Sequence, residues 1–546
     1  MRAEPWWCRP AVVMAALTGL GLMVDSLLHT SATYDEVAYL RIAARWWRTG
    51  DQTEITRMGS PLTFWKLQQV PVLWAIDRAG FTEFVDRPIE HQQALLPLVR
   101  LGGLWIWLVA LLVTTAWSRA LYGPRAMALA AWLFALSPNI LAHGALATME
   151  LPLVAATTGV FFLFWKFLRG DGRRYFWASA ALAGVAWSCK FTTVLVPPIL
   201  AVVWWAERWR DGQRRWLRLT AEVGLGILGF SAAMLAANFV VTGFALIPLS
   251  HAPGEHPSLA GRFGPTVQKW VSRAIELPMP CDWVGFATQV VHQRSGGSSY
   301  LLGARQATGW RHYYLVALAV KVPLSFWLFA VARARLRRRG PFDSMLPLVI
   351  ALFLIITSLG SSRNYGVRYL LPLAPLAIVW VSALAEASRE MRTLACVGLL
   401  GQAVAVASIH PYELTYFNVA AGGPRGGRAI LADSNLDWGQ GLKALARLQR
   451  AHPDYQDMSF YYFGDTDPRH YGVDGRCYVV DAGEDHPDLP RQVDVRSKYL
   501  AVSASLKWGP WGPKGYFQSL DGIRPVRETD DHTILIYRAA DVPQPR

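Results

Sequence analysis

The sequence predicts a polytopic α-helical membrane protein with a small C-terminal α/β domain. Of its 546 residues, 53% are hydrophobic and 17% are charged, and the mean hydropathy is +0.21. A soluble protein carries about a quarter charged residues. Apolar runs of about 17–25 residues are typical of membrane-spanning helices. Eleven runs fit this description: 10–29, 94–117, 126–143, 151–168, 175–189, 191–206, 219–241, 311–332, 345–360, 369–386 and 393–410.

Two of these runs are short. Only Cys189 and Lys190 separate 175–189 from 191–206, so one long helix is an alternative to two spans. The first run has a loose cleavage site after it, but we favour an uncleaved anchor over a signal peptide.

Basic residues predict the orientation in the membrane. With a cytoplasmic N-terminus, arginines and lysines concentrate in the inside connections, as the positive-inside rule requires. The short outside connections hold only Lys190, Arg363 and Arg368. This bias explains much of the net charge of +15. We therefore expect a cell (inner) membrane protein that contacts lipids, including anionic headgroups near 335–339, and does not bind nucleic acid.

The same orientation places three long segments outside. Segment 30–93 contains two candidate interfacial helices, Glu36–Trp47 and Leu62–Ile76. Segment 242–310 contains a glycine-rich stretch, 295–303, which is either a flexible loop over an active site or an ordinary turn.

The outside tail has a mixed composition. A helix is expected over Gln440–His452, and four strand-like runs follow it: Ser459–Phe463, Cys477–Val480, Tyr499–Ser503 and Thr533–Tyr537. The sequence thus divides into a transmembrane domain, 1–410, and an extracytoplasmic α/β domain, 411–546.

An acidic pair, Asp35-Glu36, comes a few residues after the first span. Ionised groups at a membrane boundary are costly unless they have partners or a function. The pair is therefore the first candidate for an active site. A plain helix cap at Asp35 and a solvated loop residue at Glu36 are the structural alternatives.

Four segments resemble one family in their order and side of the membrane. They are Tyr34-Asp35-Glu36, the stretch 136–150 ending at Glu150, the stretch 184–190 ending at Lys190, and the tail segment Ser434–Gln440. They are similar to the protein O-mannosyltransferase-like membrane glycosyltransferases (family 39), which include the dolichyl-phosphate-mannose and aminoarabinose transferases. The resemblance covers most of 10–410 and implies the C-type glycosyltransferase fold.

The resemblance implies a reaction. A sugar would pass from a polyprenyl-phosphate donor to an unknown protein, lipid or glycan acceptor on the outer face of the membrane. Asp35 would be the catalytic base, with Glu36 as its neighbour or positioner. The substrate-binding candidates are Glu150, Lys190, Arg363, Arg368 and His143.

Several other interpretations stay open. Glu150 is also consistent with a helix cap, Lys190 with a lysine that snorkels to the interface, and His143 with a packed helix-end residue. Asp433 and Asp437 are expected to shape a turn under which Trp438 packs. The competing functions are a lipid or sugar transporter or flippase, for which we find no internal repeat, and a non-catalytic relative that binds lipid-linked sugar.

No cofactor is indicated. Stretch 57–62 departs from the family pattern and leaves metal use and donor contacts in doubt, and the histidines and cysteines show no metal-ligand spacing. In an oxidising compartment Cys281 and Cys477 either pair or remain two thiols.

Overall fold

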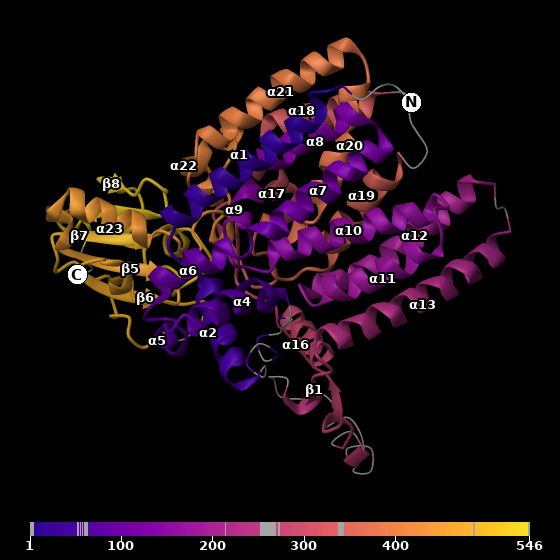
Figure 1. Cartoon of the computed structure of the whole chain (residues 1–546). Coiled ribbons are helices and arrows are strands. Elements are labelled where there is room, and N and C mark those ends of the chain that lie inside the picture. The colour runs from indigo at the N-terminus through magenta and orange to yellow at the C-terminus, as the bar shows by residue number, and fades with distance from the viewer. Residues whose placement is uncertain are drawn as a thin grey trace.

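A computed structural model describes residues 5–51, 54, 56, 58, 60, 64–212, 215–251, 269–270, 273–336, 343–483 and 486–543. Most of the stretch 57–62, and parts of the basic connections at 214 and 337–339, lie outside these residues. The helices form one large bundle, and the strands of the tail gather at one end of it (Figure 1).

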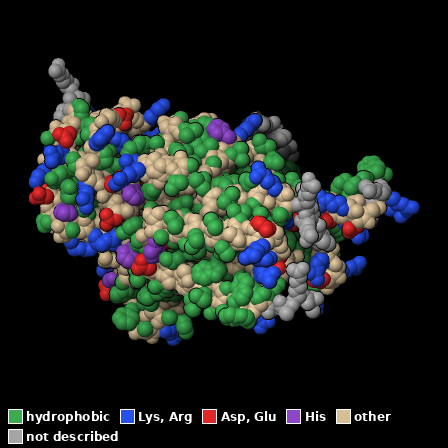
Figure 2. Space-filling model, turned by 90° about the horizontal axis from the view of Figure 1, so that it is seen from above, with side chains coloured by type: hydrophobic (Ala, Val, Ile, Leu, Met, Phe, Trp, Pro, Cys, Tyr) green, Lys and Arg blue, Asp and Glu red, His purple; other side chains and the backbone are tan. Residues whose placement is uncertain are grey.

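Apolar helices account for most of the bundle. Their bounds are α1 Cys8–His29, α6 Gln92–Leu101, α7 Leu104–Leu121, α8 Pro124–Ala135, α9 Pro138–Gly144, α10 Glu150–Leu168, α11 Arg173–Trp187, α12 Val196–Arg210, α13 Trp216–Val241, α17 Tyr313–Lys321, α18 Leu324–Arg335, α19 Met345–Gly360, α20 Leu373–Ser382 and α21 Arg389–Ala407. Apolar side chains face outward from several of them, for example Leu225 and Leu228 on α13 and Leu400 on α21. Figure 2 shows a broad field of such side chains between two ends that are richer in charge.

Within the described residues, five helical segments are long and apolar enough to cross a membrane, or up to seven if each of two bent pairs is one span. The protein is therefore a multi-pass membrane protein. The remaining bundle helices, such as α11 and α12 with 15 residues each, are shorter than a typical span. The count of eleven stays a prediction.

Two predicted spans are not single helices. Run 126–143 is broken into α8 and α9 with a bend of 62°, and run 311–332 into α17 and α18 with a bend of 108°. Each break falls at the residue before a proline, Ser137 or Val322, and both have extended backbone. Proline clashes with a helical conformation of the residue before it, which explains both breaks.

The uncertain pair at 175–206 is two helices. After α11 ends at Trp187, a short 3-10 helix, η1 (Phe191–Leu195), leads into α12. Lys190 lies in the turn between them.

The first outside segment holds α2 (Tyr34–Thr49), α4 (Phe64–Arg78) and α5 (Thr82–Asp86). Helix α2 begins at a capping box, in which Thr33 and Glu36 bond each other's backbone N–H groups. It ends at Gly50, whose left-handed φ of 71° suits a residue without Cβ. The helix predicted from Glu36 is thus two residues longer at its start.

The tail forms a mixed five-stranded sheet with the order β6-β5-β7-β9-β8. The strands are β5 Met458–Phe463, β6 Arg476–Val480, β7 Tyr499–Ser503, β8 Arg527–Glu528 and β9 Ile534–Arg538. Strand β5 runs parallel to β6 and β7, and β9 runs antiparallel to β7 and β8. All four predicted strands overlap strands of this sheet.

Both faces of the sheet are covered. Phe460 and Ile536 pack with Leu442 of α23 (Leu442–Ala451), and this cluster also includes Val37 of α2. Tyr461 and other residues of the opposite face belong to the large core of the bundle. The tail is therefore packed directly on the membrane part.

The second outside segment contributes α16 (Cys281–Ser295) and two short hairpins, β1 (Leu246–Pro248) with β2 (Pro278–Pro280) and β3 (Ser299–Leu301) with β4 (Ala304–Gln306). The glycine-rich stretch leads into β3 and turns at Gly303, where φ is 83°. No disulfide joins Cys281 on α16 and Cys477 on β6, both of which lie in the described part of the chain.

Candidate active site

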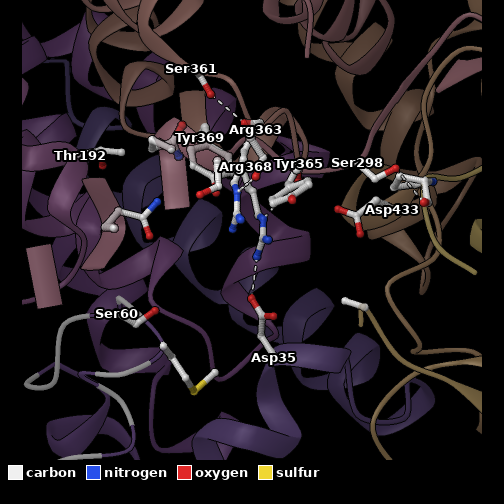
Figure 3. A pocket seen from close by; sticks show the side chains of 18 of the residues that line it. Asp35, Ser60, Thr192, Ser298, Ser361, Arg363, Tyr365, Arg368, Tyr369 and Asp433 are labelled. Atoms are coloured by element: carbon white, nitrogen blue, oxygen red, sulfur yellow. Dashed lines mark hydrogen bonds and ion pairs between the residues drawn. The ribbon is translucent and has the colours of Figure 1, made fainter. Parts of the chain in front are cut away.

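Four charged side chains from distant parts of the chain meet in one cavity of about 1130 Å³. Asp35 comes from the first turn of α2 and Glu150 from the first residue of α10. Lys190 follows α11, and Arg368 lies in the 3-10 helix η3 (Val367–Leu370). Figure 3 shows Asp35 and Arg368 facing each other across this space. The structure thus brings together four of the seven predicted site residues.

Asp35 forms an ion pair with Arg368. Arg368 Nη1 donates to Asp35 Oδ2 at 2.8 Å, and the guanidinium lies 4.2 Å from the ring centre of Trp438. The Asp35 side chain keeps 25% of its surface exposed. Burial raises the pKa of Asp35 above its ordinary value, and the Arg368 charge offsets part of that rise. A carboxylate with a raised pKa and open access suits a general base.

Glu150 joins the two cations. Its Oε1 accepts from Lys190 Nζ at 3.1 Å and lies 3.5 Å from Arg368 Nη1. Glu150 is buried, and among the described residues its Oε2 has no hydrogen-bond partner. Lys190 Nζ also lies 4.1 Å from the ring centre of Tyr369. Two cations and two carboxylates are therefore held within reach of one another.

Glu36, predicted as the neighbour or positioner of Asp35, does not line the cavity. Its carboxylate is fully buried outside the cavity lining, against the equally buried Arg100. Arg100 Nε and Nη2 donate to it at 2.8 and 2.7 Å, and the N–H groups of Ala147 and Thr33 donate at 2.7 and 3.0 Å. Burial alone would raise the pKa of Glu36, but the Arg100 charge and these hydrogen bonds hold it below its ordinary value. Such a carboxylate has no free oxygen to offer a substrate.

Among the described residues, the last two candidates, Arg363 and His143, form no ion pair with Asp35 or Glu150. Arg363 lines the cavity, but its Nε donates to the carbonyl of Gly296 at 2.7 Å, so it holds the β3–β4 segment in place. His143 is buried beside Trp438, with ring centres 6.3 Å apart, and does not line the cavity.

The tail motif supports the site from behind. Trp438 accepts the N–H of Tyr34 at 2.7 Å, and Gln440 accepts the N–H of Ser31 at 3.0 Å, through their backbone carbonyls. Segment 434–440 therefore fixes the start of α2 and carries the ring under Arg368. From the sequence, Trp438 was expected only to pack under a turn. The sequence signal for a role at the site is its position in the segment Ser434–Gln440, which carries part of the family resemblance.

The two sides of the cavity differ in character. Near Lys190 the wall is mostly apolar, with Val194 and Leu195 of η1, Phe286 and Val290 of α16, and Ile356 of α19. Near the tail it is aromatic and polar, with Tyr34, Tyr365, Asp433, Phe463 and Trp511. These wall residues were not predicted, because their sequence positions give no sign that they meet.

No group of three or more histidine, cysteine or acidic side chains is arranged to hold a metal ion in the ranges that the structure describes. Asp35 and Glu150 are each paired with a cation.

Comparison with known proteins gives a family match for part of the chain. Residues 91–235 match the model of the dolichyl-phosphate-mannose-protein mannosyltransferase family, which confirms the predicted resemblance over that segment. Among curated proteins, none matches the sequence.

Two similar solved structures are ArnT from Cupriavidus metallidurans bound to undecaprenyl phosphate and the oligosaccharyltransferase AglB from Archaeoglobus fulgidus with an inhibitory peptide and a dolichol-phosphate. ArnT is 15% identical, with a TM-score of 0.45, and the match covers 98% of this chain and 99% of that one. AglB is 12% identical, with a TM-score of 0.41, and the match covers 92% and 70%.

Proposed function

We propose that this protein is a membrane glycosyltransferase that transfers a sugar from a polyprenyl-phosphate donor to an acceptor hydroxyl. The observation that carries the proposal is the cavity in which an accessible carboxylate, Asp35, lies beside two cations, Lys190 and Arg368, with an apolar wall on one side. The match of 91–235 to a family of dolichyl-phosphate-mannose-dependent mannosyltransferases supports it.

The reaction assigns a role to each charge. Asp35 accepts the proton of the acceptor hydroxyl. At the same time the oxygen of that hydroxyl forms a bond to the anomeric carbon of the donor sugar. The bond between that carbon and the phosphate oxygen breaks, and the electron pair leaves with the polyprenyl phosphate. Lys190 and Arg368 stabilise the negative charge that develops there. The released products are the glycosylated acceptor and the lipid phosphate.

Glu150 keeps both cations in place before the donor arrives. It is almost fully buried and bonds Lys190 directly, while Arg368 is shared between Glu150 and Asp35. An incoming phosphate would compete with these carboxylates for the same N–H groups. Arrangements of this kind let a site bind an anion without leaving unpaired charges in its empty state.

The apolar wall suits the carrier. Its residues belong to η1, α16 and α19, and the exposed side chains Val194 and Val291 lie on two of these elements. An isoprenoid chain would lie here, with its phosphate at Lys190. Glu36 acts as a positioning residue, since through Arg100 it holds the α1–α2 connection that presents Asp35: Arg100 donates to the carbonyls of Leu27, Thr30 and Ser31.

The site's side of the membrane follows from the basic residues. In our proposal eleven spans make up 1–410, the N-terminus is cytoplasmic, and 411–546 is an α/β domain outside the cell (inner) membrane. The cavity, lined by residues of the outside segments and of the tail, then opens to the outer face.

The test is a transfer assay on the full-length protein in nanodiscs, with a panel of radiolabelled polyprenyl-phosphate sugars and a membrane extract as the source of acceptor. We expect one donor to release lipid phosphate, and Asp35→Asn to stop the release. Asp86→Asn removes a carboxylate from another arginine pair, 2.7 Å from Arg48, at the surface of the same outside segment, and should have no effect. Movement of an intact donor across liposomes without bond cleavage would instead identify a flippase.

A further inference from the structure

We propose that the tail side of the cavity is a carbohydrate-binding subsite built on Asp433 and Trp511, which takes a sugar ring with free hydroxyls. The inference rests on the proposed function, in which that ring is either the sugar being transferred or a sugar of the acceptor.

The backbone of Asp433 is the first observation. Its φ is 58°, in the left-handed region that glycine or asparagine adopts most readily. Non-glycine residues with this backbone conformation are concentrated at functional sites. Aspartate, like asparagine, is one of the few residues besides glycine that adopt this conformation.

The contacts of the carboxylate are the second observation. Asp433 is 5% exposed, and its Oδ1 accepts the indole N–H of Trp511 at 2.7 Å. Its Oδ2 has no hydrogen-bond partner among the residues that the structure describes. Asp433 nevertheless lines the cavity, where Figure 3 shows it beside Tyr365. A buried carboxylate oxygen without a partner is costly, and a ligand hydroxyl would satisfy it.

Asp437 gives the contrast within one motif. Its Oδ1 accepts the N–H of Gly439 at 3.1 Å and its Oδ2 accepts the N–H of Ser505 at 2.9 Å. Asp437 does not line the cavity. It therefore has the turn-shaping role expected from the sequence, whereas Asp433 has a carboxylate oxygen to spare.

A strip of aromatic rings extends from Asp433. Trp511 lies 5.6 Å from Tyr365 and is stacked on Phe463 at 5.8 Å, and Phe463 is stacked on Tyr34 at 5.5 Å, all between ring centres. All four rings line the cavity, and Trp511, Tyr365 and Tyr34 are half-buried. The strip begins beside the Arg368 loop, since Tyr365 accepts from Arg368 Nε through its carbonyl at 3.3 Å.

The Asp433 carboxylate and the aromatic strip together match the chemistry of a sugar ring. The C–H groups on one face of a pyranose are apolar and pack against an indole face, whose electron density attracts them. The hydroxyls at the ring edge are donors, and an ionised carboxylate has several acceptor sites for them. A lipid tail would use the rings but not the carboxylate, and a metal ion would use the carboxylate but not the rings.

The test separates the subsite from catalysis. Asp433→Asn keeps an oxygen for the Trp511 N–H and tolerates the left-handed backbone, so the fold should be retained. Trp511→Ala removes the ring, and Trp508→Ala is its matched control, because Trp508 is also half-buried but contacts Arg428 and does not line the cavity. All four proteins, including the parent, are assayed at full length in nanodiscs.

Two measurements are made on each protein. Saturation-transfer NMR with methyl α-D-mannopyranoside and with a mannose disaccharide reports binding of a sugar ring independently of turnover. Release of lipid phosphate from polyprenyl-phosphate mannose by hydrolysis, with water in place of the acceptor hydroxyl, reports use of the donor. We expect Asp433→Asn and Trp511→Ala to weaken at least one of the two by about tenfold or more, and Trp508→Ala to weaken neither.

Each result has one meaning. A loss confined to the soluble sugars supports the subsite and assigns it to the acceptor, and a higher KM for the donor supports it and assigns it to the transferred sugar. Unchanged sugar binding and donor KM in both variants would overturn the inference, while the assay of Asp35→Asn would still decide the proposed function by itself.

Discussion

Asp35 and Glu36 are neighbours in the chain, and each pairs with an arginine, but the surroundings of the two pairs differ. Glu36 and Arg100 are both fully buried, and each carboxylate oxygen of Glu36 has at least two donors: Oε1 has two and Oε2 has three. Asp35 is a quarter exposed, faces a large cavity, and has one arginine that it shares with Glu150.

The difference follows from helix geometry. Successive residues of a helix point about 100° apart, so at the first turn of α2 one carboxylate is directed into the cavity and the next into the core. Loss of one partner of a fully hydrogen-bonded, buried ion pair strongly destabilises the protein, because the other charge is left buried and unpaired. A partly satisfied carboxylate at a cavity can exchange its partner for a substrate. The comparison therefore separates a buried structural pair, Glu36–Arg100, from a pair at the cavity, Asp35–Arg368, to which our proposal gives the catalytic role.

The variant with the largest expected effect, and the most direct test of the difference between Asp35 and Glu36, is Asp35→Asn. We expect transfer to fall by about a hundredfold to ten-thousandfold, because the amide cannot accept the acceptor's proton. Thermal stability should stay close to that of the parent, since Thr33 and Glu36, not Asp35, cap α2, and asparagine keeps the size of the side chain. Release of labelled lipid phosphate and a melting curve check the two parts. Near-normal turnover would move the base elsewhere, with Glu150 as the next candidate.

Glu36→Gln should do the opposite. It leaves the buried Arg100 without its countercharge, which typically costs about 3–5 kcal/mol of stability. We expect a large drop in the melting temperature of the purified protein, with activity per folded molecule reduced far less than in Asp35→Asn. Glu90→Gln, which removes an exposed partner 3.6 Å from Arg87, is the control and should not change the melting temperature. A stable but inactive Glu36→Gln would return this residue to the chemistry.

Acidification should separate the two pairs in one sample. The pKa of Asp35 is raised, so the base is lost to protonation while the pH is still above the ordinary aspartate range. The pKa of Glu36 is lowered, so its contribution to stability is present above the unfolded value and disappears only as the pH falls through the lower folded value. We therefore expect an interval of pH in which the protein is folded and inactive. Turnover and intrinsic fluorescence measured over the same pH series check this, and coincident loss of both would contradict it.

Local signals in the sequence were enough for much of this site. Asp35, Glu150, Lys190 and Arg368 stand out because each is a charge next to an apolar run, where charge is costly. The strands of the tail were predicted from their alternation and composition, and all overlap observed strands. Hydropathy alone did not reveal the bends in two predicted spans. Runs 126–143 and 311–332 are predominantly apolar, but each is broken into two helices just before a proline, Pro138 or Pro323.

The role of Glu36 required knowledge of the fold. Its partner Arg100 is 64 residues away, and Ala147 is 111 residues away. The aromatic strip is similar, since Tyr34 and Trp511 come from opposite ends of the chain. Long-range contacts of this kind have no local sequence signature, and so Asp433 was assigned to a turn.

The smallest expected effect is that of Lys190→Met, which removes the second cation of the cavity, joined to the Asp35–Arg368 pair through Glu150. If Lys190 binds the carrier phosphate, its loss should weaken donor binding by about tenfold or more. Lys166→Met is the matched control, because Lys166 lies in the last turn of α10, at the opposite end of the helix from Glu150. Lys190→Arg keeps the charge and should retain most of the affinity.

A purely structural role for Lys190 makes a different prediction. If the lysine serves only to neutralise the buried Glu150, then Lys190→Met should lower stability, and the double variant with Glu150→Gln should recover it. Phosphate binding predicts instead that the double variant remains deficient in donor affinity, because removing the carboxylate does not restore the missing cation. Donor affinity and melting temperature, measured on both single variants and the double variant, form a cycle that separates the two roles. Recovered affinity in the double variant would leave Arg368 as the remaining predicted phosphate ligand of the cavity.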